Sequence, residues 1–134
     1  MTEWILSANP LIFDHERAFA ERGYIDWKQT RNFIEEDTVY IYCSKPISAI
    51  RYKTIVEKAN MTKDEISDNS DYWKGVDCGD EGNRYMRLRL IAEISVNILP
   101  FAYLKNIGLK YAPQSPCVVK DGLKQYLDAA FGGK

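Results

Sequence analysis

The segment IDWKQTRNF, residues 25–33, places a tryptophan among side chains that can donate and accept hydrogen bonds. Trp27 offers a flat ring on which a nucleobase can stack, and such stacking stabilises binding by roughly 1–3 kcal/mol per base. A bound base also needs partners for its polar edge, because buried groups left unpaired cancel much of that gain. The loop predicted around the tryptophan supplies four such partners: Asp26, Lys28, Gln29 and Thr30. The segment therefore predicts a pocket for a planar, polar ligand.

A purely structural interpretation fits the same segment. Asp26 and Gln29 have the spacing of a helix capping box, in which Asp26 is the N-cap and Gln29 reaches back to it. Trp27 would then simply pack against the core. The residues alone leave both interpretations open.

Three more positions carry candidate ligand contacts. Tyr42 and Ser44 end a predicted strand, and residues two apart lie on the same face of a strand. The Ser44 hydroxyl can donate to or accept from a base edge, although a serine before a Lys-Pro pair is also typical of an ordinary turn. Trp73 follows Tyr72 in an acidic segment without apolar periodicity. It can form a second stacking wall or anchor its loop to the core.

Arginines alternate with apolar residues in the segment RYMRLRLIAEI, residues 84–94. This period of two predicts a strand with an apolar face and a solvated, cationic face. We interpret Arg84, Arg87 and Arg89 as phosphate contacts, which position a nucleic acid without reading its sequence. A solvated strand face without a ligand is the alternative. The formal net charge of −1 argues against a broad, sequence-independent polyanion binder.

Acid–base and metal chemistry lack their usual residues. His15 is the single histidine, and we expect it on the surface, in the first turn of a helix. Cys43, Cys78 and Cys117 are widely spaced, without a CxxC pair or a cysteine–histidine cluster, so no zinc site is expected. We therefore predict a protein that is not an enzyme and that uses no cofactor and no metal.

Strand and helix signals alternate along the chain. Apolar and β-branched segments predict strands at 4–8, 38–43, 49–58 and 84–94, and a short last strand after the PQSPCVV segment. Capping residues and apolar spacing predict helices at 14–23, from residue 62, at 100–108 and at 121–131. This mixture predicts an α+β fold built on a small curved or closed sheet.

The length and the apolar pattern also bear on organisation. We expect the 134 residues to form a single domain, 1–134, and to be monomeric. The sequence shows no signal peptide and no apolar run of the roughly 20 residues that cross a bilayer. A cytoplasmic protein without membrane contact is the resulting expectation.

The order of these motifs resembles the EVE domain, a member of the PUA-like superfamily that also contains YTH and ASCH domains. The resemblance begins with Trp4 on the first strand and continues through DWKQTRNF, whose RNF sequence matches the family's turn after the tryptophan. It extends through EEDTVYIYCS, AIRYKTIVEK, YMRLRLI, LPFAYLK and PQSPCVV to the terminal helix. One departure lies in the turn before the aromatic strand, where Glu36 and Asp37 replace a Gly-Asp pair.

The resemblance implies a PUA-like pseudo-barrel with a pocket for one extruded base, as in readers of modified nucleotides that occur alone or fused to nucleases. It also implies that Gln114, in the late loop, approaches this pocket. We therefore predict a nucleic-acid-binding reader that holds a single modified, flipped or unpaired base of DNA or RNA against Trp27, with Gln29 and Ser44 at its edge. A nuclease or restriction-type protein is the expected partner.

Two alternatives stay open. One is a domain that binds a free nucleoside-like small molecule, and the other is a protein-interaction module without a ligand. Salt separates the first from a nucleic-acid reader, because phosphate contacts weaken steeply as salt rises whereas a neutral ligand is barely affected.

Overall fold

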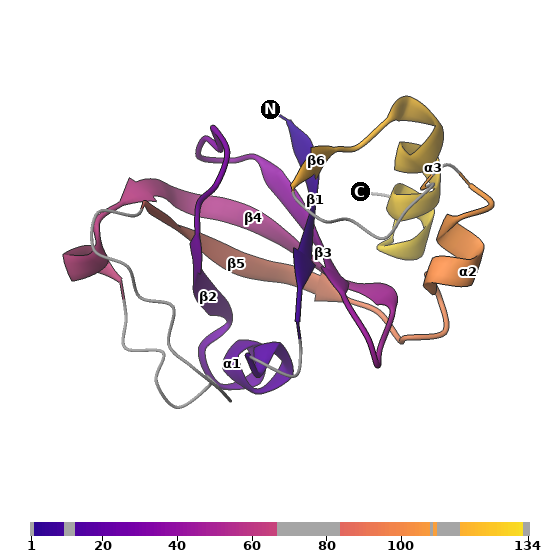
Figure 1. Cartoon of the computed structure of the whole chain (residues 1–134), viewed down its shortest axis with the longest axis horizontal. Helices are drawn as coiled ribbons and strands as arrows, with labels where there is room; N and C mark the ends of the chain where they lie inside the picture. Colours follow the sequence, from indigo (N-terminus) through magenta and orange to yellow (C-terminus); the bar gives the residue numbers. More distant parts are fainter. Residues whose placement is uncertain (1, 10–12, 67–83, 108, 110–115, 133–134) are drawn as a thin grey trace.

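Six strands form one mixed, curved sheet in the computed structural model (Figure 1). The structure describes residues 2–9, 13–66, 84–107, 109 and 116–132. The strands are β1 (Glu3–Ala8), β2 (Tyr24–Lys28), β3 (Thr38–Cys43), β4 (Ala49–Met61), β5 (Tyr85–Glu93) and β6 (Cys117–Val118). Their order is β2-β5-β4-β3-β1-β6, with β1 and β3 parallel and the other described pairs antiparallel. The predicted α+β class is confirmed, and the sheet is open because β2 and β6 form two separate edges.

Three short helices accompany the sheet in the described part: α1 (His15–Arg22), α2 (Phe101–Leu104) and α3 (Asp121–Ala130). α1 is capped as predicted, because the Asp14 side chain accepts from the Arg17 backbone N–H at 3.1 Å. At the other end Gly23 adopts a left-handed φ of 78° and donates its N–H to the Phe19 carbonyl. The helix predicted from residue 62 is a single 3-10 turn, η1 (Lys63–Glu65), and the one predicted at 100–108 is the single-turn α2. No helix among the described residues has the length and apolar character needed to span a membrane.

Each face of the sheet is covered by its own apolar core. The side chains of β3 serve both: Val39, Ile41 and Cys43 belong to the first core, whereas Tyr40 and Tyr42 belong to the second. α1 packs on the first face, and α2 and α3 cover the second (Figure 1). A strand buried on both faces explains why the segment TVYIYC is a continuous apolar run.

Three sequence predictions about residue placement are wrong. The residues around Trp27 are not a loop or a helix start: they form β2, which pairs with β5 so that Asp26 lies opposite Arg87. His15 is only 2% exposed, because the first turn of α1 lies on the first core. Tyr85 alternates with Met86 and so falls on the face predicted to be solvated, yet it is buried, at a point where the register between β4 and β5 shifts.

Candidate ligand-binding site

β2 and β5 are joined by a bidentate ion pair. Arg87 donates from Nε to Asp26 Oδ1 at 2.8 Å and from Nη2 to Oδ2 at 3.1 Å, the geometry of strong arginine–carboxylate pairs. The Asp26 side chain is fully buried, and that of Arg87 is 23% exposed. Hydrogen bonding to Asp26 raises the pKa of Arg87, whose guanidinium also lies 4.5 Å from the centroid of the Tyr24 ring. Both carboxylate oxygens of Asp26 therefore already accept hydrogen bonds from Arg87 on the neighbouring strand.

Gln29 is buried, and its amide is bonded within the chain. Nε2 donates to the Arg31 carbonyl at 3.0 Å and to Asn60 Oδ1 at 3.1 Å. Oε1 accepts from the Asn60 backbone N–H at 2.9 Å, and Arg84 Nη1 donates to Asn60 Oδ1 at 2.8 Å. These bonds fasten the end of β2 to the ends of β4 and β5. We define the β2–β5 cluster as Asp26, Gln29, Asn60, Arg84 and Arg87.

The three arginines predicted to contact phosphate differ in their partners. Arg87 pairs with Asp26, and Arg89 pairs with Glu57, whose pKa is lowered by the hydrogen bond from the guanidinium. Arg84 is exposed and donates to the neutral amide of Asn60. Of the three, Arg84 alone has no carboxylate partner within the described part of the chain. Phosphate contact by these arginines stays a prediction.

Trp27 is partly buried against the first core. Its ring centroid lies 5.3 Å from that of Phe13, in an edge arrangement, and 5.0 Å from that of His15. Lys28 and Thr30 are exposed beside it. The capping-box interpretation is wrong, because Asp26 lies within a strand. A ligand-binding role for Trp27 and its neighbours stays a prediction.

The other predicted ligand contacts are dispersed. Tyr42 is 2% exposed in the second core, where its ring meets that of Phe101 edge-on at 6.3 Å. Ser44 follows β3, is partly buried, and donates its backbone N–H to the Ala8 carbonyl at 2.9 Å. Trp73 and Gln114 lie outside the described residues.

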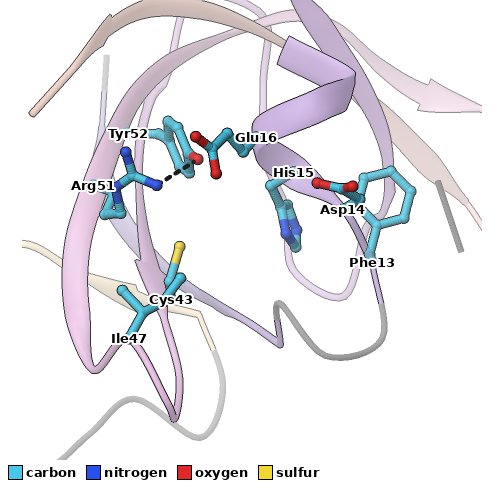
Figure 2. A pocket seen from close by; sticks show the side chains of 8 residues that line it. All are labelled: Phe13, Asp14, His15, Glu16, Cys43, Ile47, Arg51 and Tyr52. Atoms are coloured by element: carbon cyan, nitrogen blue, oxygen red, sulfur yellow. Dashed lines mark hydrogen bonds between the residues drawn. The ribbon is translucent and has the colours of Figure 1, made fainter. Parts of the chain in front are cut away.

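A cavity of about 130 Å³ lies between the start of α1 and the turn that joins β3 to β4 (Figure 2). We call it the α1 cavity; its lining residues are Phe13, Asp14, His15, Glu16, Cys43, Ile47, Arg51 and Tyr52. Its volume is close to the roughly 150 Å³ of an engineered cavity that holds benzene. The α1 cavity therefore has room for one six-membered ring.

The polar groups of the α1 cavity are mostly neutral or already paired. Arg51 Nη1 donates to the Tyr52 hydroxyl at 3.2 Å, and Nη2 donates to Glu93 at 3.4 Å. Burial raises the pKa of the Cys43 thiol to about 11, so this side chain stays protonated. Asp14 and Glu16 add carboxylates on the side of α1. The cavity thus combines an apolar wall with a hydroxyl donor and carboxylate acceptors.

The predicted site and the α1 cavity meet at two aromatic residues. Phe13 and His15 line the cavity, and both rings contact Trp27. None of the side chains predicted to contact a base is itself in the lining. The sequence does not reveal this lining, because its residues come from separate segments of the chain (13–16, 43–47 and 51–52). Within each segment, the residues are also explained by the local helix, turn or strand. The D-H-E sequence at the start of α1 is a signal that could have pointed there, because it places titratable side chains at a helix N-terminus.

Metal binding has no support in the described residues, which contain no cluster of three or more His, Cys, Asp or Glu side chains that could hold an ion.

Comparison with known proteins rests on structure rather than sequence. No family model matches the chain, and no curated protein matches it. The structure of ASCH from Zymomonas mobilis has a TM-score of 0.57 at 13% identity, over 96% of this chain and 94% of that chain. Rpa0253 from Rhodopseudomonas palustris has a TM-score of 0.67 at 13% identity, over 98% of this chain and 94% of that chain. Human THYN1, solved in complex with DNA containing 5-methylcytosine, has a TM-score of 0.64 at 11% identity, over 95% of both chains.

These likenesses confirm the PUA-like fold predicted from the motifs. The match extends over nearly the whole length of each neighbour. The pseudo-barrel implied by the resemblance takes the form of an open, curved sheet in the described part of this chain.

Proposed function

We propose that this chain is a nucleic-acid-binding domain that holds a single base in the α1 cavity. The observation that carries the proposal is a ring-sized cavity that combines an apolar wall with polar edge groups, in a fold that human THYN1 shares in its complex with 5-methylcytosine DNA. Extruding a paired base costs a few kcal/mol. A modified, mismatched or unpaired base is therefore the favoured ligand.

The residues of the α1 cavity suit a base. Phe13 and Ile47 offer apolar contact to a ring, while Tyr52 and Glu16 offer a donor and an acceptor to its edge. In the proposal, Trp27 supports this wall from behind, because its indole packs against the rings of Phe13 and His15. Replacing Trp27 by alanine should loosen the wall and weaken base binding.

Binding rather than catalysis is the proposed activity. The Cys43 thiol has a raised pKa and is 1% exposed, so it lacks the thiolate character that a nucleophile needs. Any strand cleavage linked to this domain would come from a separate nuclease-type partner.

Phosphate contacts in this proposal are few. Arg84 is the best candidate of the three predicted arginines, since the other two pair with carboxylates. Arg84→Ala should weaken binding about equally for all nucleic-acid sequences. It should also reduce the slope of log affinity against log salt concentration by about 1.

The experiment compares short oligonucleotides, as DNA and as RNA, that carry one central cytosine, 5-methylcytosine or abasic site. Fluorescence anisotropy should show that the wild type prefers the base-containing strands. Ile47→Trp fills the α1 cavity and should abolish that preference. The matched control is Ile98→Trp, because Ile98 is 48% exposed and lies outside the lining. Equal affinity of the wild type for the abasic strand, or an unchanged preference in a folded Ile47→Trp variant, would contradict the proposal.

A free nucleoside-like small molecule is the second candidate ligand. The ion pairs of Arg87 and Arg89 favour it, because they leave less positive charge for a phosphate backbone. Affinity that does not change with salt, together with equal binding of nucleoside and oligonucleotide, would select this candidate.

A further inference from the structure

The Tyr52 hydroxyl accepts a hydrogen bond but donates none to any described residue. Arg51 Nη1 donates to its oxygen at 3.2 Å, and a guanidinium has no acceptor, so the hydroxyl proton must point elsewhere. Tyr52 is 1% exposed and lines the α1 cavity. A buried donor without an acceptor is costly, and such groups are rare in native structures. The cavity therefore presents a hydroxyl proton whose acceptor is not in the described part of the chain.

The surroundings keep this hydroxyl protonated and engage its oxygen. Burial raises the pKa of Tyr52 above its ordinary value, so the group is a donor at neutral pH. Arg51, which orients the hydroxyl, is held by the Ile94 carbonyl and by Glu93, each at 3.4 Å. These contacts hold the Arg51 guanidinium against the hydroxyl oxygen and leave the hydroxyl proton for another acceptor.

Glu16 supplies the complementary group. Its side chain lines the same cavity (Figure 2). Burial is the main cause that raises the pKa of both Tyr52 and Cys43, and the charge of Glu16 raises both further. Glu16 makes no hydrogen bond or ion pair with another described residue. An ionised carboxylate only accepts, so Glu16 can bind a ligand group that carries a proton.

We propose that Tyr52 and Glu16 read the edge of one six-membered ring in the α1 cavity, with Tyr52 donating to a ring acceptor and Glu16 accepting from an adjacent amine. The inference rests on the proposed function and specifies its ligand. The amino-pyrimidine edge of cytosine has this pair of groups, and glutamate accepting from the cytosine amine is a known pairing. The volume of about 130 Å³ suits a single ring, and the lining carries two carboxylates, Asp14 and Glu16, against the one guanidinium of Arg51.

The test measures binding of cytidine and of pyrimidinone riboside, which lacks the exocyclic amine. The wild type should bind cytidine at least about tenfold more tightly, as expected for one charge-assisted hydrogen bond. Glu16→Ala should bind both nucleosides equally, because the group that distinguishes them is gone. Glu21→Ala is the control: Glu21 is also on α1 but pairs with Arg17 outside the cavity, and its variant should keep the preference.

Tyr52→Phe tests the donor. It should weaken cytidine binding about tenfold. Tyr40→Phe is the matched control, because the Tyr40 hydroxyl is also buried but belongs to the second core and should not affect binding. Melting temperatures of all variants separate loss of contact from loss of fold.

The outcomes distinguish this inference from the proposed function. If the wild type prefers cytidine and a folded Glu16→Ala variant keeps that preference, the proposed contacts of Tyr52 and Glu16 (the reading pair) are wrong, although base binding stands. If nucleosides bind as predicted but oligonucleotides do not, the reading pair stands and the nucleic-acid function is wrong. If neither nucleosides nor oligonucleotides bind, both proposals are overturned.

Discussion

The β2–β5 cluster and the α1 cavity contain similar side chains and use them differently. In the cluster, Arg87 binds Asp26 at 2.8 Å, and both amide hydrogens of Gln29 are donated within the chain. In the cavity, the hydroxyl proton of Tyr52 and the carboxylate of Glu16 make no hydrogen bond to another described residue. The polar groups of the β2–β5 cluster are thus engaged within the fold. Those of the α1 cavity are the ones that the proposed function assigns to a ligand.

The largest expected effect is on stability, at the ion pair of the β2–β5 cluster. Arg87→Ala leaves the buried carboxylate of Asp26 without its partner, which should lower the free energy of unfolding by about 3–5 kcal/mol. Urea denaturation measures this. Arg89→Ala is the control, because Arg89 and Glu57 are 48% and 34% exposed and ion pairs between exposed side chains contribute little to stability. Equal losses in the two variants would remove the distinction between the pairs.

Gln29 should have the next largest effect. Gln29→Ala removes an amide that bonds Arg31 and Asn60, and it leaves buried groups unsatisfied. The free energy of unfolding should fall by about 1–3 kcal/mol. Thermal denaturation checks this against Gln125→Ala, since Gln125 is exposed on α3. A loss of ligand binding without a loss of stability in Gln29→Ala would instead support the predicted contact between Gln29 and a ligand.

The cavity should contribute less to stability than the cluster. Tyr52→Phe removes one hydrogen bond from Arg51, which keeps its contacts to Glu93 and the Ile94 carbonyl. We expect a loss of about 1 kcal/mol or less in urea denaturation. A loss as large as that of Arg87→Ala would mean that Tyr52 holds the fold rather than a ligand.

The smallest effect is expected at the exposed pair of Lys58 and Glu65. The hydrogen bond from Lys58 Nζ, at 2.8 Å, is the main cause that lowers the pKa of Glu65 to about 2. Because the pKa of Glu65 is lower in the folded state than in the unfolded state, its ionised form stabilises the fold at pH values above the unfolded-state pKa. This stabilisation is lost as the pH falls toward about 2. Glu65→Gln should therefore flatten the acid side of the stability profile, measured by urea denaturation between neutral and acidic pH. Glu35→Gln, at another exposed position, should keep the wild-type profile.

Local patterns predicted most of the fold. The Asp14 cap and the Gly23 stop bound α1, and the apolar runs of β3 and β4 gave strands near their observed limits. These features depend on residues close together in the chain, so the sequence carries them directly.

The errors came from contacts between distant residues. β2 becomes a strand by pairing with β5, and the ion pair that accompanies this pairing joins residues 61 positions apart. The α1 cavity needs Phe13, Cys43 and Tyr52 to meet, and no local pattern specifies that meeting. His15 was expected on the surface because its helical position was clear while the core beneath it was not.

The most direct test of base binding in the α1 cavity is amide chemical-shift mapping. Two oligonucleotides are compared, identical except that one carries a single 5-methylcytosine where the other is abasic. If the base binds in the α1 cavity, the shifts caused by the base alone fall on residues 13–16 and 43–52. Base-dependent shifts confined to residues 24–29 and 84–89, or no base-dependent shifts in a protein that binds both strands, would contradict binding in this cavity.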